Sequence, residues 1–407
     1  MRIVVAGALA NKPEYGGEAW VRMAWVMGLK RLGADVLFVE ELDLEERNAV
    51  EPLAAPATPH VCFFRTVAAD FGLLDASALI TPRGDDIAGV PMAAALDFAS
   101  HADLLVNISG HLRNPSLFAA VKRRAYIDLE PGYTQAWHAA GIGDLRLHAH
   151  DAHFSVGLNV GSEVCPVPLR GIRWTPVLPP VVLDEWPATD IPNPLRFSTV
   201  ASWSGTHGRV TQGGRKRGLK LHEFRKVADL PRRTGLPMEI ALEVQPEDHQ
   251  ERAVMHGRGW SIVDPREVAS TPRSFREYIQ ASSAELSAAQ SIYVGTTSGW
   301  FSDRSACYLA AGRPVVVQHT GFARKLPVGE GILPYRTVDG AEDAVRSVML
   351  APDRHGRAAR EIAEAYFDSD KVLAEFLDRA LPTRRPRSIA RGGRDTVDST
   401  SPKHHSR

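Results

Sequence analysis

The 407-residue sequence has few cysteines and no long apolar run. Cys62, Cys165 and Cys307 are odd in number and widely spaced, which excludes a disulfide framework and fits neither a zinc motif nor a redox motif. No apolar stretch approaches the roughly 20 residues that a membrane-spanning helix needs. We therefore expect a cytoplasmic protein without integral membrane contact.

The sequence also lacks an excess of charge of either sign. Its formal net charge is +0, so no field of the whole molecule favours nucleic acid or an anionic membrane as a partner. A G-x-G-x-x-G motif followed by a ribose-binding acid is absent, which argues against an NAD oxidoreductase. At this length, and with 44% hydrophobic residues, the chain can form two α/β domains, each with its own core.

The first half opens with a β-α-β pattern. Ile3–Gly7 is a short apolar run typical of a buried parallel strand, Ala19–Leu32 has apolar residues at helical spacing, and Asp35–Val39 predicts a second strand. Further strands are predicted at Leu104–Ile108 and Ala125–Leu129. The pattern predicts a parallel, Rossmann-like sheet.

The second half repeats this architecture after a proline-rich stretch, Cys165–Pro192, which reads as the connection between domains. Arg196–Ala201 predicts a new first strand, followed by a glycine-rich, basic loop. Further helix and strand candidates are Met238–Val244, Phe275–Leu286, Ser291–Gly295, Arg304–Ala311 and Pro314–Gln318. The predicted organisation is a first domain over 1–178, a linker over 179–192, a second domain over 193–381 with a closing helix, and a disordered basic tail over 382–407.

One loop of the second half has the features of a diphosphate site. Thr296–Arg304 contains a glycine, follows the strand predicted at Ile292–Val294 and precedes the helix that ends at Ala311. Such a loop at a helix N-terminus binds phosphate through backbone N–H groups and the helix dipole. Ser302 suits the N-cap and Asp303 the first turn. The alternative is a Rossmann crossover without a ligand.

This segment resembles the donor site of GT-B glycosyltransferases. The matching residues are Gly299, Trp300, Ser302, Gly312, Pro314 and Val315. Two departures are evident: Thr297 stands where that family has a phosphate-binding histidine, and Cys307 stands where it has a ribose-binding glutamate. The resemblance implies an α/β GT-B fold, with two Rossmann-like domains facing across a cleft, and a nucleotide-diphosphate sugar as co-substrate. It also implies that no metal or other cofactor is required.

The resemblance assigns roles in donor binding to several further residues. The donor phosphates would be bound by Gly16, Gly17, Arg217, Lys220, Ser298, Gly299, Ser302 and Asp303. The base would contact Trp260 and Val263, and the sugar would contact Gln318, His319 and Thr320. Each assignment has a plain alternative: a tight turn at the glycines, a solvated basic loop at the cations, core packing for the tryptophan, and an ordinary polar turn at 318–320.

His111 is the candidate catalytic residue, because it follows the strand Leu104–Ile108 and several GT-B families have an active-site histidine after a comparable strand. It would accept the proton of the acceptor hydroxyl or hydrogen-bond the donor sugar. The alternative is a surface loop histidine.

Two other groupings resemble metal sites. His148 and His150 would share one strand face, but no second cluster completes a zinc site. Asp128 and Glu130 follow a strand and resemble the acidic motif of the GT-A fold, against which the second Rossmann-like half argues.

The sequence thus predicts a glycosyltransferase of the hexosyltransferase type, acting on an unknown small-molecule, glycan or lipid-linked acceptor. Two alternatives are a non-catalytic nucleotide-sugar-binding protein and a nucleotide-sugar epimerase on the same fold. The stereochemistry, inverting or retaining, stays open.

Overall fold

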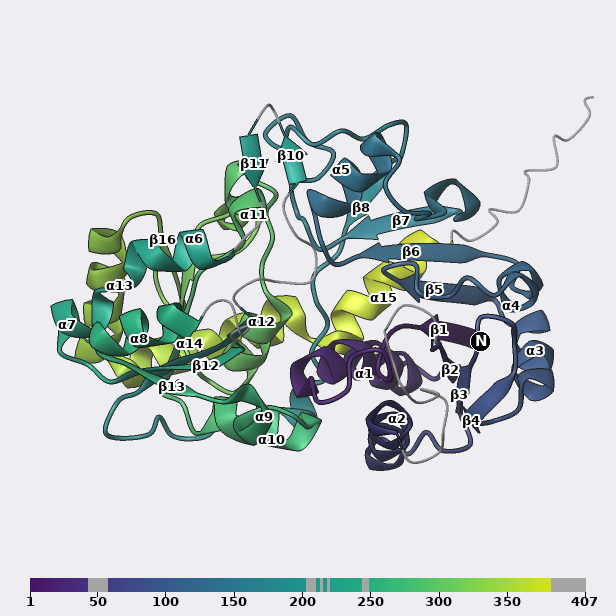
Figure 1. Cartoon of the computed structure of the whole chain (residues 1–407), viewed down its shortest axis with the longest axis horizontal. Coiled ribbons are helices and arrows are strands. Elements are labelled where there is room, and N and C mark those ends of the chain that lie inside the picture. The colour runs from purple at the N-terminus through teal and green to yellow at the C-terminus, as the bar shows by residue number, and fades with distance from the viewer. Residues whose placement is uncertain (43–57, 203–209, 213–214, 218–219, 244–248, 382–407) are drawn as a thin grey trace, which may run out of the picture.

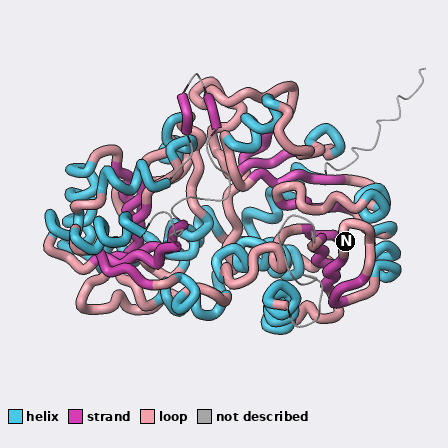
Figure 2. Tube along the Cα trace, viewed as in Figure 1, coloured by secondary structure: helices cyan, strands magenta, loops and turns pink. Residues whose placement is uncertain are grey.

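A computed structural model of the chain describes residues 1–42, 58–202, 210–212, 215–217, 220–243 and 249–381. The chain forms two lobes, each built around a twisted sheet with helices on its faces (Figures 1 and 2). The predicted tail, 382–407, lies outside the described residues.

The first lobe contains an eight-stranded sheet in the order β4-β3-β2-β1-β5-β6-β7-β8, in which only β4 is antiparallel to its neighbour. Its strands are β1 (Arg2–Ala6), β2 (Asp35–Glu41), β3 (Ser77–Ile80), β4 (Asp86–Gly89), β5 (Leu104–Ile108), β6 (Arg124–Asp128), β7 (Ala152–Ser155) and β8 (Trp174–Pro176). The helices are α1 (Gly16–Arg31), α2 (Pro59–Asp70), α3 (Met92–Ser100), α4 (Pro115–Ala120) and α5 (Tyr133–Ala140), with 3-10 turns at Leu147–Ala149 and Leu183–Glu185.

The second lobe contains a six-stranded parallel sheet in the order β13-β12-β9-β14-β15-β16. Its strands are β9 (Phe197–Ser202), β12 (Met238–Glu243), β13 (Trp260–Val263), β14 (Ala284–Ser287), β15 (Val315–Gln318) and β16 (Ile332–Tyr335), and β10 (Val210–Gln212) and β11 (Arg215–Arg217) form a separate hairpin. The helices are α6 (Lys220–Phe224), α7 (Leu230–Thr234), α8 (His249–Gly257), α9 (Pro265–Val268), α10 (Pro272–Gln280), α11 (Ser291–Gly295), α12 (Asp303–Ala310), α13 (Val338–Leu350) and α14 (Pro352–Ile362). Short helical turns cover Arg225–Val227, Phe322–Arg324 and Ala363–Phe367.

The last helix, α15 (Ser369–Ala380), crosses from the second lobe back to the first (Figure 1). Its Phe376 packs edge-on against Trp25 of α1, with ring centroids 5.0 Å apart, and against Phe154 at 4.7 Å. Arg31 of α1 binds Asp370 at 2.9 Å. The C-terminal helix therefore belongs to the core of the first lobe, although the sequence predicted it as part of the second domain.

The proline-rich stretch contains the last strand of the first sheet. Trp174–Pro176 forms β8, which pairs with β7 at the edge of the first sheet, and Trp174 is buried. The chain crosses to the second lobe only after this strand, through Pro179 and Pro180.

One predicted strand is wrong. Ser291–Gly295 is the helix α11, and the strand that precedes the donor-type loop is β14, which the prediction had merged into a helix spanning Phe275–Leu286. Helix α10 ends at Gln280, and the polar pair Ser282-Ser283 separates it from β14. A short apolar run such as 291–295 does not distinguish a strand from one buried helical turn.

We predict that Phe376→Ala lowers the free energy of unfolding by about 3–5 kcal/mol, because it removes a buried aromatic ring and leaves a cavity between α1 and α15. Chemical denaturation measures the change. Leu350→Ala is the control, since Leu350 is 87% exposed and its truncation should leave stability nearly unchanged. Equal stability of the two variants would contradict the docking of α15 on the first lobe.

Candidate active site

The two lobes meet at a side chain of the first lobe that binds backbone of the second. The backbone N–H of Asn159 donates to the Ser298 carbonyl at 2.9 Å. The side-chain Nδ2 of Asn159 donates to the carbonyls of Thr297 at 2.9 Å and Gly321 at 3.2 Å. A Cβ on Gly299 would lie 2.9 Å from the Asn159 amide nitrogen, and one on Gly321 would lie 2.6 Å from Nδ2. Both glycines are therefore required for this close approach.

The N-terminus of α12 is fixed by a buried ion pair next to this contact. Arg304 Nε donates to Glu285 Oε1 of β14 at 2.7 Å, and Glu285 is fully buried. The same guanidinium donates to the Val200 carbonyl at 2.9 Å and to Ser287 Oγ at 2.6 Å. Arg304 thus connects the first turn of α12 to the carboxyl ends of β9 and β14.

Ser302 and Asp303 begin α12 as the sequence predicted. Ser302 is the N-cap residue, and within the described chain its side chain makes no capping hydrogen bond to the first turn. Burial, together with Glu18, raises the pKa of Asp303 to about 6. An ionised carboxylate repels phosphate, so the backbone N–H groups of this turn are better suited to a diphosphate than the Asp303 side chain is.

Lys220, the first residue of α6, lies in the neighbourhood of the Arg304 guanidinium. Burial and the charge of Arg304 lower its pKa to about 7, against the opposing effects of Glu285, Asp303 and Glu130. Lys220 and Arg304 therefore place two basic groups near the N-terminus of α12.

The first lobe faces the start of α12 with charged residues of α1 and its preceding loop. Glu18 binds Lys12 at 3.1 Å and also binds Arg22. Burial, followed by Arg22 and Lys12, lowers the pKa of His111 to about 3, so its imidazole is neutral at physiological pH. Glu18 and Arg22 act on both His111 and Asp303, which shows that the start of α12 and the loop after β5 share one electrostatic neighbourhood.

Two consecutive carboxylates of β2 hold the loop after β1, which contains Lys12, and the loop after β5, which contains His111. The buried Glu40 accepts hydrogen bonds from the backbone N–H of Ala10 at 2.8 Å and of Asn11 at 2.9 Å. Glu41 accepts hydrogen bonds from the backbone N–H groups of Arg113 and Asn114. Because successive strand side chains point to opposite faces, one strand end fixes both the loop after β1 and the loop after β5.

Asn107, the buried residue before the end of β5, closes the loop of His111. Its Oδ1 accepts the Leu112 N–H at 3.0 Å, and its Nδ2 donates to the Leu112 carbonyl at 3.2 Å. Ser109 and Gly110 have φ values of 54° and 71°, which turn the chain so that His111 follows the strand end.

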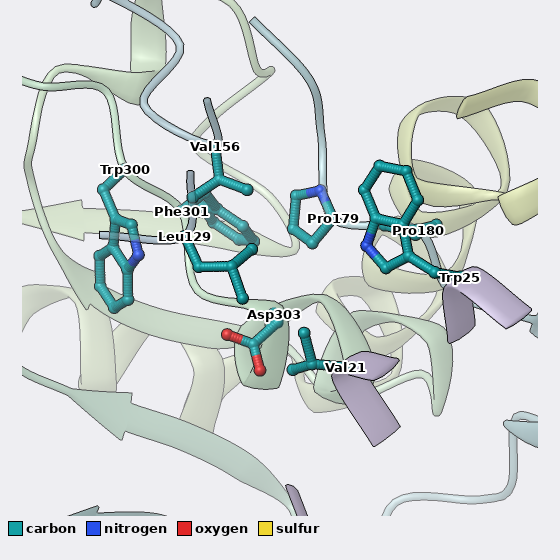
Figure 3. Close-up of a pocket in the computed structure, with 9 residues that line it drawn as sticks. All are labelled: Val21, Trp25, Leu129, Val156, Pro179, Pro180, Trp300, Phe301 and Asp303. Atoms are coloured by element: carbon teal, nitrogen blue, oxygen red, sulfur yellow. The ribbon is translucent and has the colours of Figure 1, made fainter. Parts of the chain in front are cut away.

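A pocket lies between α1, the ends of β6 and β7, and the start of α12 (Figure 3). It is lined by Val21, Trp25, Leu129, Val156, Pro179, Pro180, Trp300, Phe301 and Asp303. Asp303 is the one charged residue of this lining (Figure 3). The surrounding apolar side chains explain why burial raises its pKa.

Several residues assigned to the donor are placed elsewhere. Gly16 and Gly17 lie against the second lobe: a Cβ on Gly16 would lie 2.1 Å from the Thr271 carbonyl oxygen, and one on Gly17 would lie 2.9 Å from the Phe275 ring. The glycine pair instead allows α1 to pack closely against α9 and α10. Trp20 supports this contact by donating to the Pro272 carbonyl at 2.7 Å.

Within the donor-type loop, Ser298 and Gly299 are buried beneath Asn159 instead of lining an open site. Thr320 is 1% exposed and donates to the Trp300 carbonyl at 2.5 Å. Gln318 is also buried and donates to Glu223 of α6 at 2.6 Å. These polar side chains take part in holding the second lobe together.

The remaining donor assignments differ in outcome. Trp260, the predicted base-stacking residue, is buried against Phe224 and its Nε1 donates to the Ala228 carbonyl at 2.8 Å, as in the core-packing alternative. Val263 ends the edge strand β13, and Arg217 ends β11. His319 is partly exposed and hydrogen-bonds Arg336 at 3.2 Å.

The two groupings that resembled metal sites have structural roles. Asp128 accepts hydrogen bonds from Thr134 at 2.6 Å, Gln135 at 2.9 Å and Ser155 at 2.7 Å. His150 is buried and hydrogen-bonded to the Arg146 carbonyl at 3.0 Å. Over the described ranges, no group of three or more His, Cys, Asp or Glu side chains is arranged to hold a metal ion, and no helix is long and apolar enough to cross a bilayer.

Sequence reasoning missed four residues of this site: Glu18, Arg22, Glu285 and Arg304. A charged residue inside an apolar strand was the available signal for Glu285, since burying a charge requires a partner. Glu18 and Arg22 have i, i+4 spacing at the start of the helix predicted at Ala19–Leu32, which normally indicates a solvated surface pair. Only the tertiary structure places that pair opposite α12.

Comparison with known proteins supports the architecture. No protein-family model matches the chain, and no curated protein matches it in sequence. An alpha-glucosyltransferase solved with UDP-glucose and DNA containing an abasic site superposes with a TM-score of 0.59 at 13% identity, over 93% of this chain and 99% of that one. HepE from Anabaena, solved with UDP-glucose, gives a TM-score of 0.57 at 12% identity, over 93% and 100%.

Sucrose-phosphate synthase from Thermosynechococcus elongatus superposes with a TM-score of 0.50 at 11% identity, covering 92% of this chain and 97% of that one. These similar structures are GT-B glycosyltransferases, and the chain has the same GT-B fold. The predicted fold class, two Rossmann-like domains in the GT-B arrangement, is thereby confirmed.

We predict that Glu285→Gln destabilises the second lobe by about 3–5 kcal/mol, because it leaves the buried Arg304 charge without its counter-ion. The exposed i, i+4 pair Arg273–Glu277 provides the matched control. Glu277→Gln should change the free energy of unfolding by less than about 1 kcal/mol. If both variants unfolded at the same denaturant concentration, the Glu285–Arg304 pair would not be the anchor of α12.

Proposed function

We propose that this protein is a glycosyltransferase that transfers a sugar from a nucleotide-diphosphate donor to an acceptor bound by the first domain. The observation that carries the proposal is the convergence of two cations, Lys220 and Arg304, on the N-terminus of α12 opposite the neutral His111. The GT-B fold and the UDP-containing complexes of similar structures agree with this reading.

Each part of the site has a role in this proposal. The backbone N–H groups at the start of α12 bind the diphosphate, and Lys220 and Arg304 offset the negative charge that develops on the leaving nucleotide. His111 hydrogen-bonds the reacting hydroxyl or accepts its proton, for which the neutral imidazole has a free acceptor nitrogen. Catalysis would need no metal ion, because these fixed cations and dipoles stabilise the charge that Mg²⁺ or Mn²⁺ stabilises in other transferases.

A non-catalytic nucleotide-sugar-binding protein is the second candidate. The observation that favours it is Cys307, a buried thiol at the position where the GT-B families named above have a ribose-binding glutamate. Donor binding without transfer or hydrolysis would identify this second function.

The charge of Lys220 gives a pH-dependent prediction. Since its pKa is near 7, the ammonium is present below pH 7 and is lost as the pH rises through this value, so affinity for UDP should fall between pH 7 and pH 9. Lys220→Ala should raise the dissociation constant about 10- to 100-fold at pH 6.5, as expected for one charge-assisted hydrogen bond. Calorimetric titration in buffers of different ionisation enthalpy also measures the proton taken up on binding.

Lys220→Arg is the control for this prediction, because it keeps the charge and removes the titration in this range. Its affinity should be independent of pH between 7 and 9. A pH dependence in Lys220→Arg identical to that of the native protein would show that another group is responsible.

Metal independence is tested separately. Transfer measured with a panel of UDP-, GDP-, TDP- and ADP-sugars should proceed at the same rate in EDTA as in added Mn²⁺, because the charge on the leaving group is stabilised by Lys220 and Arg304. Loss of turnover in EDTA and its recovery with Mn²⁺ would contradict this part of the proposal.

A further inference from the structure

The first domain has two cations, Lys12 and Arg22, that the roles above do not use. Together with the imidazole of His111 they form a basic cluster, in which Glu18 is the one carboxylate that binds the cations among the described residues. Arg113, at the turn after His111, adds a further positive charge to the same neighbourhood.

Arg22 is the buried member of this cluster. Its side chain is 2% exposed and passes over Gly7 at the end of β1, where a Cβ would lie 2.9 Å from Arg22 Cγ. Its Nη1 binds the Glu18 carboxylate and, at 3.1 Å, the Glu18 carbonyl, whereas the buried Nε has no hydrogen-bond partner in the described structure. A buried N–H donor without an acceptor is unfavourable, and a ligand with a free lone pair can provide the acceptor for Arg22 Nε.

The cluster has more positive than negative charge. Although burial acts to raise it, Lys12 and Arg22 hold the pKa of Glu18 below its usual range, so Glu18 contributes one negative charge against two positive ones. His111 is neutral and adds no positive charge in this state. The remaining charge favours an anion.

We propose that this cluster is a second anion site, which binds a phosphate or carboxylate group of the acceptor through Lys12 and Arg22. The acceptor assignment rests on the proposed transferase function. The site is distinct from the donor site because Asp303 lies between the two: it interacts with Glu18 and Arg22 on one side and with Arg304 on the other. A single diphosphate bound to both groups of cations would have to pass this carboxylate.

An anion at Lys12 and Arg22 would also change His111. Burial, the largest cause of the low pKa of its imidazole, would remain, but the cations that add to the effect would be neutralised, so the pKa should rise from its present value. Among the described residues, the charged groups that act on this imidazole are Arg22, Lys12, Glu18 and Arg113. A charged acceptor would thereby make His111 a stronger base only when the acceptor is bound.

The test uses inorganic phosphate and the imidazole resonances of His111 in the full-length protein, recorded by NMR. Phosphate should shift these resonances saturably and raise the pKa of His111. Lys12→Gln and Arg22→Gln should each weaken phosphate binding about tenfold, which corresponds to the loss of one charge-assisted contact. Arg83→Gln is the matched control, since Arg83 is an exposed arginine of the same domain and should leave the titration unchanged.

Lys12→Gln keeps the test independent of folding defects, because Lys12 is partly exposed, whereas Arg22 is buried. An unchanged phosphate titration in Lys12→Gln would overturn the anion site. A second titration adds UDP to the phosphate-saturated protein. If UDP binds without displacing phosphate, the cluster is a separate site, as proposed; if UDP displaces it, the cluster belongs to the donor and the acceptor assignment is wrong.

Failure of the transferase function is distinguished by the same experiment. If no nucleotide sugar binds and phosphate still titrates His111 through Lys12 and Arg22, the anion site stands and only its assignment to an acceptor falls.

Discussion

The arrangement of the cleft depends on the buried ion pair between Glu285 and Arg304. At 2.7 Å and an effective dielectric constant of about 20, the Coulomb attraction is about 6 kcal/mol, whereas removing two ions from water costs several kcal/mol for each. The net contribution to stability is therefore small. What the pair provides is position: it fixes the first turn of α12 against β9 and β14, so that Lys220, Arg304 and Asp303 have defined places.

Helix α1 connects this site to both domains. Trp20 packs against Trp186, with ring centroids 5.1 Å apart, and Trp25 packs against α15, while Glu18 and Arg22 lie on the side that acts on Asp303. Because Gly16 and Gly17 permit backbone contact with α9 and α10, the amino end of the helix is held by the second domain. A change in the relative position of the domains would thus move Glu18 and Arg22 with respect to α12.

The sequence predicted the elements whose signal is local. Ile3–Gly7, Asp35–Val39 and Leu104–Ile108 coincide with β1, β2 and β5 within two residues, because a buried parallel strand is a continuous apolar run. The helix at Ser291–Gly295 was predicted as a strand, because the periodicity of so short an apolar run does not distinguish a helix from a strand. Ser302 as the N-cap of α12 followed from residue type and the adjacent helix.

The side-chain assignments depended on tertiary packing and were less successful. Trp260, Gln318 and Thr320 have chemistry that suits a ligand, but each finds its partner inside the second domain. No spacing rule separates a polar side chain that faces a cleft from one that binds a neighbouring carbonyl. His111 and Lys220 were chosen because they follow predicted strand ends, where open α/β sheets bind ligands, and their roles remain predictions.

The absence of the family's glutamate is accompanied by an acidic group one helical turn away. Cys307 is buried in the core of the second domain, and burial raises the pKa of its thiol well above the usual value.

Asp303 lies four residues before Cys307, on the same face of α12 and about 6 Å closer to the helix start. There the carboxyl group interacts with Glu18 and Arg22 of the first domain. The acidic residue of this helix therefore lies at the interface between the domains, where its protonation responds to both.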